Sequence, residues 1–167
     1  NKGPNQMFLN NGDGTFSDVT DQSQTRDLGW GASATFFDLD HDGWLDLYIT
    51  NYVEYSLASH KLCRALSGAP DYCAPVAYRP QKDRFFRNQG DGFFGDWGGR
   101  SNILSDIGAG LGVVAGDWNA DGWTDLYVAN DGMANFLWVN QGNGTFTDGA
   151  LLAGSAVNME GRPEAGM

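Results

Sequence analysis

The chain has 167 residues, and its 21 acidic and 10 basic side chains give a formal net charge of −11. That length suits one compact domain, and a content of 41% hydrophobic and 13% aromatic residues excludes a disordered acidic tail. The negative charge argues against nucleic-acid binding, no apolar run is long enough to span a bilayer, and the 24 glycines exclude a protein built of long helices.

The first predicted element is a β-hairpin over residues 6–19. The segment Phe8–Phe16 reads FLNNGDGTF, and similar segments recur as FRNQGDGFF at Phe86–Phe94 and WVNQGNGTF at Trp138–Phe146. Each contains an Asp-Gly or Asn-Gly pair between aromatic flanks, which is a strong signal for a tight hairpin turn. We therefore expect three hairpins of one kind, each followed two residues later by an aspartate (Asp18, Asp96 and Asp148).

A second kind of segment occurs twice and reads as strand, acidic loop, strand. Residues 29–51 and 108–130 align without gaps, with 10 of 23 positions identical. Residues 45–50 of the first copy read LDLYIT, in which Leu45, Leu47 and Ile49 fall on one side. This alternation predicts a strand with one face inward.

Residues 52–84 form an insertion within the first full repeat, and it contains both cysteines of the chain, Cys63 and Cys73. The chain has only these two cysteines, which argues against a zinc site. We expect a disulfide, a bond typical of an oxidising compartment. The alternative is two unpaired thiols in a cytosolic loop. The insertion is also the segment that we expect to face partners, because loops often carry binding functions.

Joined in chain order, these segments predict an all-β chain of β-propeller blades, each a four-stranded antiparallel meander. Residues 1–167 would then be a single partial propeller of about two and a half blades. It comprises the outer hairpin of a first blade at 6–19, full blades at 31–97 and 109–148, and a linker to the next blade at 149–167. Because a propeller closes with about four to eight blades, and the chain starts at Asn1 without a signal-peptide pattern, we expect an excised part of a larger propeller or an assembly completed by other chains.

The two acidic loops predict metal sites. They read DLDHDGWLD at residues 38–46 and DWNADGWTD at residues 117–125. Oxygen donors at positions 1, 3, 5 and 9 and the carbonyl of position 7 converge on one point, while glycine at position 6 allows the sharp turn. Such all-oxygen sites suit Ca²⁺, of which we expect about two per chain. The predicted ligands are Asp38, Asp40, Asp42, the Trp44 carbonyl and Asp46 in one loop, and Asp117, Asn119, Asp121, the Trp123 carbonyl and Asp125 in the other.

Two other interpretations compete for these loops. An EF-hand needs an acid at position 12 and flanking helices, whereas position 12 is Ile49 or Val128 inside a predicted strand. The remaining alternative is that Asp, Asn and Gly merely form a polar turn. His41 and Ala120, at position 4, are expected to point away from the ion, with His41 facing solvent.

The pattern G-x-G followed by D-x-[DN]-x-D-G-x-x-D-L resembles the FG-GAP, or VCBS, repeats of integrin-α-like calcium-binding β-propellers. The NGDGTF units and the insertion ending in YCAPVAYRPQKDRFFRNQGDG resemble the ASPIC/UnbV branch, a cartilage acidic protein-like group. The resemblance spans residues 5–150. It implies a secreted or surface propeller with Ca²⁺ between the first two strands of each blade, at the ligands named above. Asn119 departs from an all-Asp loop and lowers the charge of its site by one.

These features predict an extracellular Ca²⁺-binding module that serves adhesion or binds a protein or glycan and is not an enzyme. We expect it to be secreted, periplasmic or on the cell surface, with no nucleic-acid partner and no membrane span. One alternative is a structural protomer of a surface filament or sheath that self-assembles through open blade edges. Another is a propeller-fold enzyme, a lyase or hydrolase, that acts through its loop carboxylates.

Two smaller features leave alternatives open. Asn143 begins an N-glycosylation sequon, although its place in a hairpin turn also explains it. The tryptophans either form a sugar-stacking surface or pack between blades; they are Trp30, Trp44, Trp97, Trp118, Trp123 and Trp138.

Overall fold

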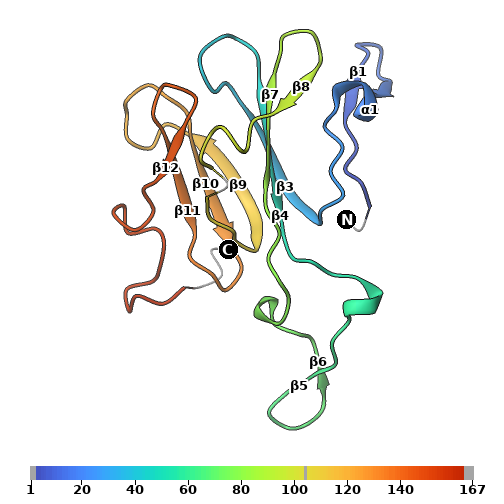
Figure 1. The fold of residues 1–167 in the computed structure, drawn as a ribbon, viewed down its shortest axis with the longest axis vertical. Helices are drawn as coiled ribbons and strands as arrows, with labels where there is room; N and C mark the ends of the chain where they lie inside the picture. The colour runs from blue at the N-terminus through green and yellow to red at the C-terminus, as the bar shows by residue number, and fades with distance from the viewer. Residues whose placement is uncertain (1–2, 104, 164–167) are drawn as a thin grey trace.

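The fold is that of a computed structural model, which describes residues 3–103 and 105–163. Its elements are, in order, β1 (Phe8–Asn10), β2 (Phe16–Asp18), α1 (Thr20–Ser23), β3 (Gly31–Phe37), β4 (Asp46–Asn51), β5 (Cys63–Arg64), β6 (Pro70–Asp71), β7 (Arg84–Asn88), β8 (Phe94–Asp96), β9 (Gly110–Gly116), β10 (Asp125–Asn130), β11 (Phe136–Asn140) and β12 (Phe146–Asp148) (Figure 1). Two short 3-10 turns, Leu57–Ser59 and Pro75–Ala77, lie in the insertion.

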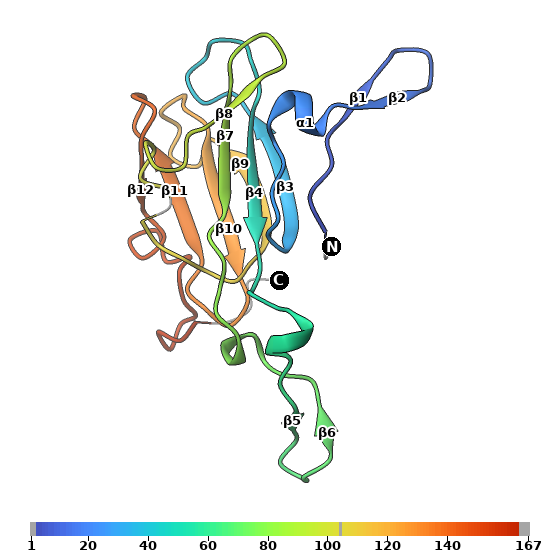
Figure 2. The ribbon, with the colours of Figure 1, turned by 45° about the vertical axis from the view of Figure 1, so that its right-hand side comes forward.

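The strands form two four-stranded antiparallel sheets, each a meander in chain order. The first runs β3-β4-β7-β8 and the second β9-β10-β11-β12. Strands β1 and β2 form a separate hairpin, which stands to one side of β3 (Figure 2). The prediction of an all-β chain with blade-like sheets is confirmed, with two complete meanders and two two-stranded sheets, β1–β2 and β5–β6, in the described part of the chain. Within that same part, no helix has the length and hydrophobicity needed to cross a membrane.

The three predicted hairpins share one register. Asn10 pairs with Phe16, Asn88 with Phe94, and Asn140 with Phe146. The second glycine of each turn has φ between 82° and 88°, a left-handed conformation that glycine adopts without a steric penalty. The three segments therefore form the same turn, because each has a glycine at the position where the backbone needs a positive φ.

Strand β4 is buried on both faces, so the expectation that only one face points inward is wrong. Tyr48, fully buried, packs in the core between the two sheets. Leu47 and Ile49, on the opposite face, form a second cluster with Phe86 and Phe94. The side chains of β4 do alternate between its two faces. Both faces are nevertheless packed, because other segments of the chain cover the sheet on each side.

The two sheets pack through a shared aromatic core and a polar contact. The rings of Phe85 and Phe146 meet edge to face, with centroids 6.0 Å apart. At one end of the sheets, Asn140 Nδ2 donates a hydrogen bond of 2.9 Å to the carbonyl oxygen of Leu39. Leu39 belongs to the first acidic loop, so the second sheet directly supports that loop.

The insertion projects from the end of the first sheet that lies opposite the β3–β4 loop (Figure 1). It forms the small two-stranded sheet β5–β6. Cys63 and Cys73 are joined in the expected disulfide, with their Cα atoms 5.1 Å apart. Arg84, which the sequence placed last in the insertion, is the first residue of β7.

Candidate metal centre

The two acidic loops connect equivalent strands and follow the same backbone path. Residues 38–45 join β3 to β4, and residues 117–124 join β9 to β10 (Figure 1). His41 and Ala120 both have φ of 60°, and the glycines at position 6, Gly43 and Gly122, have φ of 85° and 91°. The two left-handed residues in each loop turn the chain sharply and direct the flanking aspartates inward.

The first loop brings three carboxylates together. Asp38, Asp40 and Asp42 each offer an oxygen atom, and these atoms lie within 4.8 Å of one another. Asp38 Oδ2 accepts a hydrogen bond of 3.1 Å from the Gly43 backbone, but Oδ1 of Asp38 and Oδ1 of Asp40 are buried without a hydrogen-bond partner. Buried acceptors without partners are costly, and neighbouring carboxylates repel. A hard divalent cation would coordinate the oxygens that lack partners and would reduce the repulsion between the carboxylates, so this donor set fits Ca²⁺.

The aspartate at position 9 braces each loop against the third strand of its sheet. Asp46 Oδ2 accepts from the Leu39 backbone and Asp46 Oδ1 from the Asn88 backbone, both at 2.8 Å. In the second sheet, the two oxygens of Asp125 accept from Trp118 and Asn140, at 3.1 and 2.9 Å. Asp46 therefore lies outside the group of three carboxylates and holds the loop closed through backbone hydrogen bonds.

Burial changes the ionisation of these bracing acids. It raises the pKa of Asp46 to about 6, although the two backbone hydrogen bonds to this carboxylate act to lower that pKa. Burial likewise raises the pKa of Asp125. The negative charges of neighbouring loop aspartates act in the same direction at both positions. A cation in the loop would oppose this shift, because it favours the ionised carboxylate.

The second loop differs because an amide replaces one carboxylate. Asn119 Nδ2 donates to Asp121 Oδ2 at 2.8 Å, and Asn119 Oδ1 accepts from the Asp121 backbone at 3.0 Å. Asp117 Oδ2 accepts from the Gly122 backbone at 2.9 Å, as Asp38 does from Gly43. The amide thus removes one negative charge from the loop, and its N–H group hydrogen-bonds one of the remaining carboxylates.

The tryptophans at position 7 cover the hairpin glycines. Trp44 packs over Gly90 and Trp123 over Gly142; a Cβ added at Gly142 would lie 2.8 Å from the indole. Each Trp backbone N–H donates to the position-5 aspartate at 2.8 Å. The ring of His41 stacks on Trp123, with centroids 4.4 Å apart, so this exposed histidine links the two loops rather than facing only solvent.

Sequence reasoning missed one residue of this centre, Arg87 on β7. Its guanidinium contacts Oδ2 of Asp40 and lies 3.5 Å from Oδ2 of Asp42. The signal was present in the hairpin repeats, where Arg87 stands in FRN while the matching segments read FLN and WVN. Nothing in local spacing relates it to Asp40, however, because the contact joins residues 47 positions apart.

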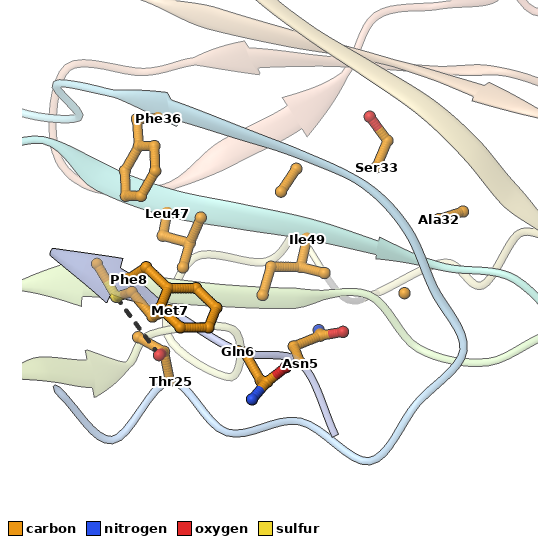
Figure 3. A pocket seen from close by; sticks show the side chains of 12 residues that line it. Asn5, Gln6, Met7, Phe8, Thr25, Ala32, Ser33, Phe36, Leu47 and Ile49 are labelled. Carbon is orange, nitrogen blue, oxygen red and sulfur yellow. Dashed lines mark hydrogen bonds between the residues drawn. The ribbon is translucent and has the colours of Figure 1, made fainter. Parts of the chain in front are cut away.

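Two cavities lie away from the acidic loops. One, of about 540 Å³, lies between the N-terminal segment and the β3–β4 face, with Leu47 and Ile49 on its wall and Thr25 donating to Met7 Sδ beside it (Figure 3). The other, of about 620 Å³, is lined by Trp30, four tyrosines and the disulfide of the insertion. Of the six tryptophans, Trp138 is buried in the core and Trp30 lines this second cavity.

Comparison with known families gives one match. The sequence model of the FG-GAP-like repeat matches residues 1–49, 67–128 and 117–163. These three matches together cover most of the chain and include both acidic loops. No curated protein matches the chain at a significant level.

Proposed function

The chain belongs to the FG-GAP-like repeat family, and from that premise we propose that it is an extracellular, non-catalytic β-propeller module stabilised by Ca²⁺. One ion is assigned to each acidic loop. The observation that carries this proposal is the first loop, where three carboxylates converge and two of their buried oxygens have no partner. Oxygen-only donor sets of this kind favour Ca²⁺ over softer metals.

In this proposal the ions are ligated by the aspartates and by one amide. Asp38, Asp40 and Asp42 hold the first ion, with the carbonyl of Trp44 and with Asp46 from the bracing position. Asp117, Asn119, Asp121, the carbonyl of Trp123 and Asp125 hold the second. Each ion offsets two of the negative charges of its loop and fixes the connection between the first two strands of a blade, so Ca²⁺ binding stabilises the folded chain by mass action.

The insertion is the surface that we assign to a partner, either a protein or a glycan, in an adhesive role outside the cell. Its disulfide is typical of oxidising compartments, which supports a secreted, periplasmic or cell-surface location. The aromatic cavity beside the disulfide supplies a concave apolar surface of the kind that binding sites use. Together with the hairpin repeats, this insertion supports placing the chain in the ASPIC/UnbV branch.

Calorimetric titration of chelator-stripped protein with Ca²⁺ tests the proposal. We expect about two ions per folded chain. Asp42→Asn should abolish binding at the first loop only, and Asp121→Asn at the second only. The matched control is Asp91→Asn, which removes one negative charge from a hairpin turn that the third repeat builds with Asn143. It should leave both sites intact. A chain that is folded by circular dichroism yet binds no Ca²⁺ would refute the proposal.

A further inference from the structure

Arg87 is held firmly against the first acidic loop. Its guanidinium contacts Asp40 and Asp42 from the neighbouring strand, and its carbon Cζ lies 5.2 Å from the ring centroid of Trp97. Trp97 is fixed in turn, because its Nε1 donates to the Gly144 carbonyl at 3.2 Å. The Arg87 side chain is only 31% exposed. A guanidinium packed on an indole and directed at two carboxylates is part of the site rather than a mobile surface charge.

The two repeats differ at both ends of this contact. The position of Asp40 is occupied by Asn119 in the second loop. The position of Arg87 is occupied by Val139, one residue before an asparagine that bonds the bracing aspartate in both sheets. One loop therefore has an acid in contact with a cation, while the other has an amide and an apolar residue at the register position of that cation. As a result, the first loop with its arginine and the second loop carry the same net charge.

We propose that Arg87 is a built-in counter-charge that offsets the extra carboxylate of Asp40 and thereby keeps the Ca²⁺ affinity of the first site close to that of the second. This inference rests on the proposed Ca²⁺ binding. Arg87 acts as a positioning residue: it occupies Oδ2 of Asp40 and leaves Oδ1, which has no partner, for the ion. Its positive charge also opposes the arriving ion at short range, which lowers an affinity that four carboxylates would otherwise raise.

The same contact stabilises the loop when no ion is bound. Carboxylates that converge without a cation repel one another, and the guanidinium relieves part of that repulsion. Without Arg87, the first loop should therefore be less stable in chelator and gain more from Ca²⁺. This effect on the ion-free chain gives the inference a second, independent readout.

The test uses variants that copy one repeat into the other, all in an Asp121→Asn background so that calorimetry reports the first site alone. Arg87→Val copies Val139 and should tighten Ca²⁺ binding about tenfold. Asp40→Asn copies Asn119 and should weaken binding by a similar factor. The double variant should return to within about threefold of the starting affinity. Arg87→Lys keeps the charge and should stay close to the starting value.

Melting in chelator supplies the second readout: Arg87→Val should lower the melting temperature of the ion-free chain and enlarge the shift that Ca²⁺ produces. Should Arg87→Val fail to fold, Arg87→Gln removes the charge with less change of shape and should also tighten binding. Ca²⁺ binding that is unchanged or weaker without the charge overturns the role of Arg87 and leaves the proposed function standing. A folded parent chain that binds no Ca²⁺ at either loop overturns the proposed function and this inference with it.

Discussion

Asp83 is a carboxylate buried beside β4, away from both acidic loops. It accepts hydrogen bonds from Tyr48 Oη at 2.7 Å and from the Asn51 backbone at 2.8 Å. Burial, aided by the charge of Asp27, nevertheless raises the pKa of Asp83 to about 6. The folded chain therefore binds a proton at Asp83 more readily than the unfolded chain does, and the ionised form costs stability above that pH.

The first prediction concerns this residue. As the pH falls from about 6 to about 4, Asp83 takes up a proton in the folded chain before it does so in the unfolded chain, so its contribution raises stability. The linkage is about 1.4 kcal/mol per pH unit for one proton. Asp83→Asn keeps one acceptor oxygen for the Asn51 backbone N–H and places its NH₂ group against the Tyr48 hydroxyl oxygen. Because the amide does not titrate, this variant should remove that contribution to the slope. Urea unfolding at several pH values in chelator measures it, and equal slopes for both proteins would contradict the assignment.

The second prediction separates the bracing aspartates from the other loop acids. In chelator, Asp125→Ala should lose about 2–4 kcal/mol of unfolding free energy, because two backbone N–H groups are left without their acceptor. Asp121→Ala, which removes an exposed acid from the same loop, should cost less than about 1 kcal/mol without the ion. Denaturant unfolding distinguishes them. Equal losses would mean that the two backbone hydrogen bonds of Asp125 do not stabilise the ion-free loop.

At the scale of elements, the disulfide should act locally. The insertion forms its own two-stranded sheet. At its base it contacts the rest of the chain through a hydrogen bond of 2.6 Å that Tyr52 Oη donates to Asp131. Replacing both cysteines by serine should speed amide exchange of residues 63–73 at least about tenfold, because a local loop loses its covalent constraint. Amides of β4 and β7 should keep their protection. Hydrogen-exchange mass spectrometry measures both, and equal acceleration in β7 would show that the insertion supports the blade.

The elements that local sequence chemistry determines were predictable. The hairpins followed from Asp-Gly and Asn-Gly turns, and β4 and β10 from alternation after an acidic loop. What could not be predicted depends on contacts between distant segments: the burial of both faces of β4, the approach of Arg87 to Asp40, and the stacking of His41 on Trp123. Each requires knowing which sheet lies against which, and a period of two reports that a strand has two faces without saying what each face meets.

At the scale of the whole molecule, the shared core should make the two sheets unfold together. Phe85 of the first sheet packs among Phe37, Tyr48 and Phe146. Phe85→Ala should therefore cost about 3–5 kcal/mol and destabilise both sheets. The matched control is Phe36→Ala on the same sheet, where the side chain is 49% exposed and the loss should be much smaller.

Scanning calorimetry with hydrogen exchange checks this expectation. If the two sheets unfold together, calorimetry shows one transition whose calorimetric and van't Hoff enthalpies are equal. Phe85→Ala should then speed amide exchange in β4, β7, β10 and β11 alike. Two separable transitions, with exchange accelerated only in the first sheet, would show instead that each blade is its own folding unit.

The first acidic loop and the insertion lie at opposite ends of the first sheet, separated by the length of β4 and β7 (Figure 1). This separation matters for how such a protein can diversify. Substitutions around the β5–β6 sheet leave the loop carboxylates untouched, because the contacts that tie the insertion to the blades lie at its base, at Tyr52 and Asp83. A lineage can therefore acquire new recognition at one end while inheriting an unchanged blade from the other, and the two blades of this chain already show one with that addition and one without.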